Sequence, residues 1–127
     1  VLNIAELKNK NYKKVVDDIK KTKEICKNHN LKVIIETDLL TKEEIVTASK
    51  CAIDGSADFV KTSTGFVKNG LGAKVEDVKL MYKTVKPYGL SVKASGGIKT
   101  TKQAIDLINA GASRLGTSSG VDIIQNI

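Results

Sequence analysis

Residues 58–66 read Asp-Phe-Val-Lys-Thr-Ser-Thr-Gly-Phe, a short apolar strand pattern that ends in a lysine followed by small hydroxyl residues and a glycine. The lysine, Lys61, falls at the carboxyl end of the expected strand. Its apolar neighbours Phe59 and Val60 disfavour a charged amine by desolvation, which makes Lys61 a candidate nucleophile for Schiff-base chemistry. Taken alone, a lysine at a strand end is more often a solvated residue.

A second strand pattern ends in the same way one unit later. Residues 91–98 read Ser-Val-Lys-Ala-Ser-Gly-Gly-Ile and place Lys93 at the corresponding position. Because the carboxyl ends of parallel strands meet at one edge of a sheet, we expect Lys61 and Lys93 to lie close together. Two neighbouring lysines each disfavour the ammonium form of the other. The matched pair therefore favours a catalytic role over simple solvation.

Around these two segments, apolar runs typical of strands alternate with stretches of helical periodicity. Thr41 and Glu44 form a capping-box pattern that predicts a helix start. The alternation, repeated about four and a half times, predicts an α/β fold with a parallel sheet and right-handed crossovers. The expected strands cover residues 2–5, 31–36, 58–62, 90–94 and 113–116, and the expected helices cover 12–28, 41–55, 74–86, 101–111 and 118–124.

Two architectures satisfy this alternation. An open doubly wound sheet would be complete at the 127 residues of this chain. A (β/α)8 barrel needs about 250 residues, so the chain would supply only its C-terminal part. Periodicity alone does not separate the two.

The glycine-rich segments after the last two expected strands suggest an anion site. Residues 95–97 (Ser-Gly-Gly) and 116–120 (Gly-Thr-Ser-Ser-Gly) each lead into a helix, and free backbone N–H groups there can hold a phosphate. Ordinary tight turns that need glycine are the alternative. Neither segment matches a P-loop, and no GxGxxG follows the first expected strand, which argues against a nucleotide-binding sheet.

The composition narrows the function classes. The net charge is +7, carried by lysines spread along the chain with only one arginine, a pattern that favours a solvated surface over a nucleic-acid interface. No apolar run is long enough to span a membrane. Cys26 and Cys51 stand apart without metal-ligand spacing, so we expect buried free thiols, no metal, and a reducing, cytoplasmic compartment.

Together these segments resemble the deoxyribose-phosphate aldolases. The resemblance rests on residues 1–8, 31–37, 59–66, 93–98 and 111–120, in the family's order and spacing, and it covers essentially the whole chain. It implies a class I aldolase on a (β/α)8 barrel that needs no metal and no other cofactor. The implied substrate is a phosphorylated sugar, 2-deoxy-D-ribose 5-phosphate, cleaved to D-glyceraldehyde 3-phosphate and acetaldehyde.

The resemblance also implies roles for individual residues. Lys61 is similar to the family's Schiff-base lysine, and Lys93 is similar to the second lysine, which assists proton transfer. Six further residues resemble those that line the substrate and phosphate end: Thr64, Gly65, Gly96, Gly97, Ser118 and Ser119.

One family residue has no counterpart in this chain. The resemblance places the proton-relay aspartate shortly before Val1, and neither Asp38 nor Asp58 occupies that position. We therefore expect residues 1–127 to form a single partial barrel domain without its N-terminal units. Such a domain is expected to self-associate into a homo-oligomer or to bind the complementary half. The alternatives are an inactive or self-associating aldolase fragment and a complete flavodoxin-like phosphate-binding module.

Overall fold

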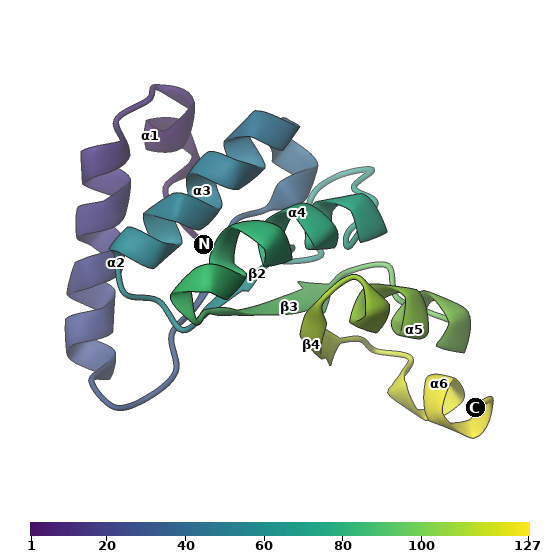
Figure 1. Cartoon of the computed structure of the whole chain (residues 1–127). Helices are drawn as coiled ribbons and strands as arrows, with labels where there is room; N and C mark the ends of the chain where they lie inside the picture. The colour runs from purple at the N-terminus through teal and green to yellow at the C-terminus, as the bar shows by residue number, and fades with distance from the viewer.

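The computed structural model describes all 127 residues, Val1–Ile127. Helices and strands alternate along the chain, with the strands in the middle of the fold and the helices packed beside them (Figure 1). The elements are α1 (Ile4–Lys8), α2 (Tyr12–Cys26), β1 (Lys32–Ile34), the 3-10 helix η1 (Thr37–Leu39), α3 (Lys42–Asp54), β2 (Phe59–Lys61), α4 (Val75–Val85), the 3-10 helix η2 (Lys86–Tyr88), β3 (Ser91–Ser95), α5 (Thr101–Asn109), β4 (Ala112–Gly116) and α6 (Gly120–Gln125).

The sheet decides between the two architectures. Its four strands are all parallel and follow the chain order β1-β2-β3-β4. A doubly wound sheet reverses its strand order at a switch point, whereas the strands of a (β/α)8 barrel follow one another without reversal. The unbroken order is that of consecutive barrel units, so the chain forms part of a (β/α)8 barrel.

The two faces of the sheet differ in burial. Val33, Val60 and Val92 are register partners on adjacent strands and are fully or nearly fully buried. Consecutive helices α2, α3, α4 and α5 pack against one another, and Figure 1 shows them following one another along the sheet. The alternate residues Lys32 and Phe59 point to the opposite face and remain half-buried. That opposite face corresponds to the inside of a barrel.

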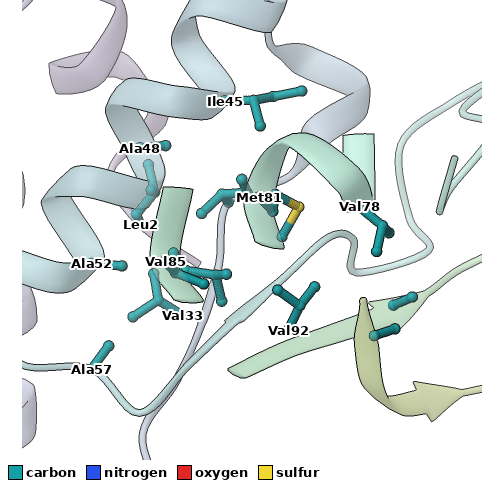
Figure 2. Packing of buried hydrophobic residues seen from close by; sticks show 14 of the residues in the cluster. Leu2, Val33, Ile45, Ala48, Ala52, Ala57, Val78, Met81, Val85 and Val92 are labelled. Atoms are coloured by element: carbon teal, nitrogen blue, oxygen red, sulfur yellow. The ribbon is translucent and has the colours of Figure 1, made fainter. Parts of the chain in front are cut away.

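The core lies between the helices and the sheet. Figure 2 shows Met81 and Val85 of α4 between Ile45 of α3 and the strand residues Val33 and Val92. The helix that ends at Asp54 is followed by Gly55, as the sequence predicts. A methyl group on Gly55 would lie only 2.3 Å from Ile19 Cγ2, so glycine is needed there for close packing of α2 against α3.

Two capping boxes define helix starts. Thr41 accepts a hydrogen bond from the N–H of Glu44, whose side chain accepts one from the N–H of Thr41, which confirms the predicted start of α3. Thr100 and Gln103 form the same reciprocal pair at α5. The last helix differs, because Ser119 precedes α6 but makes no side-chain cap bond.

The predicted strand at residues 2–5 is also wrong. The Asn3 side chain accepts a hydrogen bond from the N–H of Glu6 and starts the short helix α1 instead. Only the N–H of Leu2 bonds alongside β1, to the carbonyl of Ile34 at 3.0 Å. The local apolar run is typical of a strand, whereas asparagine is a strongly preferred residue at a helix N-cap.

Some large apolar side chains of the helices lie at the surface. Ile25 is 83% exposed, and Ile105 and Ile108 are about half exposed, because no element of this chain packs over them. Both cysteines are free, and Cys51 is buried while Cys26 is only half-buried. No helix of the structure combines the length and the apolar composition that a membrane crossing requires.

Candidate active site

A cavity of about 360 Å³ opens at the carboxyl ends of β2, β3 and β4, the edge at which barrel enzymes carry their sites. Three loops supply its walls, one after each strand. The lining residues are Lys61, Ser63, Thr64, Gly65, Ser95, Gly96, Gly97, Ile98, Lys99, Gly116, Thr117 and Ser118.

Lys61 and Lys93 are brought together as expected. They are register partners on the adjacent parallel strands β2 and β3, and their side chains leave the same face of the sheet. Lys61 lines the cavity directly. The Lys93 side chain reaches toward β4, where a methyl group built on Gly116 would lie 3.2 Å from its Cε and 3.8 Å from its Nζ. Lys93 is not one of the lining residues, but its amine lies next to Gly116, which is.

The surroundings of Lys93 disfavour its charged form. Desolvation by burial, followed by the nearby cations of Lys61, Lys32 and Arg114, lowers the pKa of Lys93 below its ordinary value. Lys32 Nζ and Arg114 Cζ both lie over the Phe59 ring, at 5.2 and 5.3 Å from its centroid. The inner face therefore concentrates positive charge around an aromatic ring.

Hydrogen bonds between the loops hold the cavity floor. The Thr62 hydroxyl donates to the carbonyl of Ser95 at 2.9 Å and accepts from the N–H of Ser95 at 3.0 Å. The Ser95 hydroxyl donates to the carbonyl of Ser63 at 2.7 Å. Two adjacent strand ends are thus joined by three buried bonds, and the side chain of Ser63 is left free between them.

Thr64 is held from another strand. Its N–H donates to Oε1 of Glu36 at 3.0 Å, and its hydroxyl donates to Oε2 of the same carboxylate at 2.6 Å. Glu36 follows β1, is buried, and has a left-handed backbone with φ of 58°. The side chain of Thr64 is therefore committed within the protein.

The glycine-rich end of the cavity is formed by a close approach of two backbones. A methyl group on Gly72 would lie 2.3 Å from the carbonyl oxygen of Gly96, and one on Gly97 would lie 2.6 Å from the carbonyl oxygen of Leu71. Gly72, Gly96 and Gly97 all have positive φ, which glycine adopts without strain. The lysine Lys99 lines the same end and supplies a cation.

Six of the eight predicted site residues line this cavity, and Lys93 and Ser119 do not. The N–H of Ser119 donates to the Thr117 hydroxyl at 2.9 Å, and that hydroxyl donates to the carbonyl of Ile98 at 2.6 Å. The sequence analysis did not single out Ser63, Lys99 or Glu36. Lys99 carried a readable signal, since it lies two residues after the Gly-Gly pair, whereas Glu36 had no local signal.

The two carboxylates that the sequence analysis set aside have structural partners. Asp38 accepts hydrogen bonds from the N–H groups of Leu71 and Gly72 at 3.0 and 2.9 Å. Asp58 lies before β2, at the end of the strand away from the cavity, and accepts from Lys23 and from the N–H of Leu31. No group of three or more His, Cys, Asp or Glu side chains could hold a metal ion.

A second hollow of about 390 Å³ lies between α2 and β1, at the edge of the sheet. Its lining includes Leu2, Val15 and Val33 but none of the glycine-rich loops. The hollow exists because β1 is an edge strand. Along its free edge only the N–H of Leu2 forms a hydrogen bond, to the carbonyl of Ile34. The chemistry-bearing side chains are gathered at the first cavity instead.

The comparison with known proteins agrees with this geometry. The family model described as DeoC/LacD family aldolase matches residues 1–126. The chain belongs to the DeoC/LacD aldolase family. Among its curated relatives, the deoxyribose-phosphate aldolase of Mycoplasma capricolum is 52% identical over 124 residues, which are 98% of this chain and 54% of the relative. Deoxyribose-phosphate aldolase 1 of Mesoplasma florum is 53% identical, over 98% of this chain and 56% of the relative.

Solved aldolase structures show the same fold. The aldolase QR15 superimposes with a TM-score of 0.90 at 41% identity, over 98% of this chain and 55% of that structure. The deoxyribose phosphate aldolase from Aeropyrum pernix, described as a unique tetramer, superimposes with a TM-score of 0.83 at 31% identity, over 91% of this chain and 49% of that one. The chain spans about half the length of the DeoC/LacD aldolases that it matches.

Proposed function

We propose that this chain carries the Schiff-base site of a deoxyribose-phosphate aldolase, which cleaves 2-deoxy-D-ribose 5-phosphate to D-glyceraldehyde 3-phosphate and acetaldehyde. The observation that carries the proposal is the register pairing of Lys61 with Lys93 beside a cavity of glycine and hydroxyl residues. Membership in the DeoC/LacD aldolase family supports the same reaction.

In this proposal the amine of Lys61 attacks the aldehyde carbon of the open-chain sugar, and loss of water leaves a protonated imine. The bond between the second and third carbons then breaks. Its electron pair moves toward the iminium nitrogen and forms an enamine, while the hydroxyl on the third carbon loses its proton and becomes the new aldehyde. Protonation of the enamine and hydrolysis of the resulting imine release acetaldehyde and restore Lys61.

Lys93 is the proposed proton carrier of these steps. Burial and the neighbouring cations lower its pKa, which brings the amine closer to the pH at which a general acid or base works best. Its amine lies beside Gly116 at the cavity wall, within the same layer as Lys61.

The phosphate is proposed to bind at the exposed end of the cavity. Gly97, Lys99 and Ser118 are all exposed there, so a charged group can stay partly hydrated. Backbone N–H groups next to glycines, together with a lysine cation, suit an anion. Gly65 and Gly96 complete the proposed wall.

No carboxylate lines the cavity in this chain. We propose that the proton-relay aspartate comes from a complementary barrel half, and that such a half or a second copy of the chain covers the inner face. The cationic face around Lys32 and Arg114 favours an acidic partner surface. Without that partner the chain would form the imine but turn over slowly. The free thiols of Cys26 and Cys51 fit a reducing, cytoplasmic compartment.

The test is reductive trapping. The chain is treated with acetaldehyde and borohydride, and the modified lysine is found by peptide mass mapping. We expect selective labelling of Lys61, weakened strongly by Lys93→Leu. Lys32→Leu is the matched control, because it removes a cation from the same face without removing the proposed proton carrier. Labelling scattered over surface lysines, or equal losses in both variants, would contradict the proposal.

A further inference from the structure

Five hydroxyl side chains line the cavity, and their hydrogen bonds divide them into two groups. Those of Thr64, Ser95 and Thr117 each donate to a protein oxygen, at 2.6, 2.7 and 2.6 Å respectively. A hydroxyl has one proton, so these three have none left to donate to a ligand. Only Ser63 and Ser118 remain, and Ser118 is exposed to solvent.

Ser63 is unusual among them because it is buried without a partner. The residue is 1% exposed, and its Oγ makes no hydrogen bond within the protein. Leaving a buried hydroxyl unpaired is energetically unfavourable. A bound ligand that pairs with Ser63 Oγ would recover this free energy.

The backbone around Ser63 is held rigidly on both sides. Thr62 exchanges two hydrogen bonds with Ser95, the carbonyl of Ser63 accepts a third from the Ser95 hydroxyl, and Thr64 is held by Glu36. Gly96 lies over Ser63, where a methyl group would come within 3.3 Å of its Cβ and 3.7 Å of its Oγ, so glycine keeps the space beside the buried hydroxyl free of a side chain. A rigidly positioned free hydroxyl is suited to orient a ligand.

The position of Ser63 selects the group that it contacts. It lies two residues after Lys61 and belongs to the buried part of the lining, whereas the glycine-rich end at Gly97 and Lys99 is exposed. A neutral buried hydroxyl matches a neutral ligand hydroxyl, whereas a phosphate dianion is better held at the exposed, cationic end.

We propose that Ser63 Oγ hydrogen-bonds a hydroxyl group of the bound sugar phosphate, between the carbon that reacts with Lys61 and the phosphate. The side chain of Thr64 does not contact the sugar phosphate in this proposal; it holds the loop in place. This inference rests on the proposed aldolase function and adds to it the residue that distinguishes a hydroxylated substrate from a simple aldehyde.

The experiment compares Ser63→Ala with Ser49→Ala. Ser49 on α3 is the matched control, because its hydroxyl is also buried and unpaired but lies outside the cavity lining. Half-saturation of borohydride trapping at Lys61 is measured with three compounds: 2-deoxyribose 5-phosphate, glycolaldehyde phosphate, which has an aldehyde and a phosphate but no hydroxyl, and acetaldehyde. Thermal unfolding is recorded for each variant.

We expect Ser63→Ala to raise the half-saturating concentration of 2-deoxyribose 5-phosphate about 3- to 10-fold, as the loss of one hydrogen bond does. The half-saturating concentrations of the other two compounds should not change in Ser63→Ala. In Ser49→Ala the values for all three compounds should stay as in the native chain. Neither variant should unfold at a lower temperature than the native chain. Equal half-saturation in Ser63→Ala and Ser49→Ala, an equal loss for glycolaldehyde phosphate, or an unfolding temperature lowered only by Ser63→Ala would overturn the proposal. Absence of trapping at Lys61 with every compound would instead reject the proposed aldolase site itself.

Discussion

The carboxylate of Glu36 accepts two hydrogen bonds from Thr64, one from its N–H at 3.0 Å and one from its hydroxyl at 2.6 Å. Two residues further on, Asp38 accepts from the N–H groups of Leu71 and Gly72. The loop after β2 is thus held near both of its ends by carboxylates that follow β1. The bonds keep the loop against the cavity while its middle, with Phe66, stays exposed.

Glu36→Ala should loosen this loop. Removing a buried carboxylate that accepts two hydrogen bonds should lower the free energy of unfolding by about 2–3 kcal/mol and speed hydrogen exchange at the Thr64 amide. Urea denaturation and exchange followed by NMR measure the two effects. Glu24→Ala, at an exposed position of α2, is the control and should change the unfolding free energy by less than about 0.5 kcal/mol. Unchanged exchange at Thr64 in Glu36→Ala would contradict the holding role.

Lys93 should make stability depend on pH. Burial and the neighbouring cations lower the pKa of Lys93 in the folded chain, whereas the unfolded chain has the ordinary value of 10.5. Between these two values the unfolded chain binds more protons, so the folded state gains stability as the pH rises toward 10.5. At pH values below the pKa of Lys93 in the folded chain, the charged lysine destabilises the folded state to its full extent.

Lys93→Met removes this contribution. The variant should be more stable than the native chain at pH 7, and its advantage should shrink as the pH approaches 10.5. Urea denaturation at several pH values between 7 and 10.5 measures the difference. Lys79→Met, which removes an exposed lysine of α4, is run in parallel to account for the change in overall charge. A difference between Lys93→Met and the native chain that grows with pH would refute the assignment.

Gly72 should be needed for the shape of the cavity and not only for its own backbone. Gly72 and Gly89 both have positive φ, of 75° and 81°, but a methyl group on Gly72 would meet the Gly96 carbonyl whereas one on Gly89 would meet nothing within 4 Å. Gly89→Ala should therefore lower the unfolding free energy by about 1–2 kcal/mol through backbone strain alone. Gly72→Ala should lower it further by displacing Gly96.

The two glycine variants should also differ in anion binding. Gly72→Ala should weaken the binding of inorganic phosphate, because Gly96 lies in the cavity wall, and Gly89→Ala should leave it unchanged. Titration calorimetry with phosphate at low salt measures the affinity. Equal phosphate affinity in both variants would show that the anion binds away from the Gly96 turn.

The chain should associate at high concentration. The free edge of β4 and the exposed Ile105, Ile108 and Ile124 on the packed helices α5 and α6 favour contacts with a second molecule. Sedimentation velocity over a range of concentrations should show a dimer or larger species.

Ile108→Asp should shift this equilibrium toward the monomer by about tenfold or more, which corresponds to roughly 1.4 kcal/mol. Asn109→Asp adds the same charge one residue away on α5 and should leave the association nearly unchanged. A native chain that stays monomeric at the highest concentrations would contradict the expectation drawn from its open edge.

Much of the local structure could be predicted from sequence patterns. The capping box at Thr41 and the end at Gly55 bound α3 as expected, and the apolar runs around Val33, Val60 and Val92 form the expected strands. These features depend on neighbours within a few positions. The exception at residues 2–5 arose because the Asn3 cap outweighed the apolar pattern.

The sequence by itself determined which residues are the candidates for the proposed chemistry. Two lysines at the ends of consecutive strands, each followed by small polar residues and glycine, were enough to point to Lys61 and Lys93 as a pair. Parallel strands of similar length place their carboxyl ends at one edge, so the pairing follows from the order of elements. The choice between a doubly wound sheet and a barrel did not follow from the order of elements, because both architectures have the same local alternation. Only the observed strand order separates them.

Only the tertiary structure decided which hydroxyl of the Thr-Ser-Thr sequence is free. Thr62, Ser63 and Thr64 are adjacent and similar in chemistry, yet Thr62 pairs with Ser95, 33 positions later, and Thr64 pairs with Glu36, 28 positions earlier. Ser63 is left unpaired between them. A hydroxyl proton goes to the acceptor that the fold brings within about 3 Å, and for these residues that acceptor comes from a different strand unit, which no local pattern in residues 58–66 records.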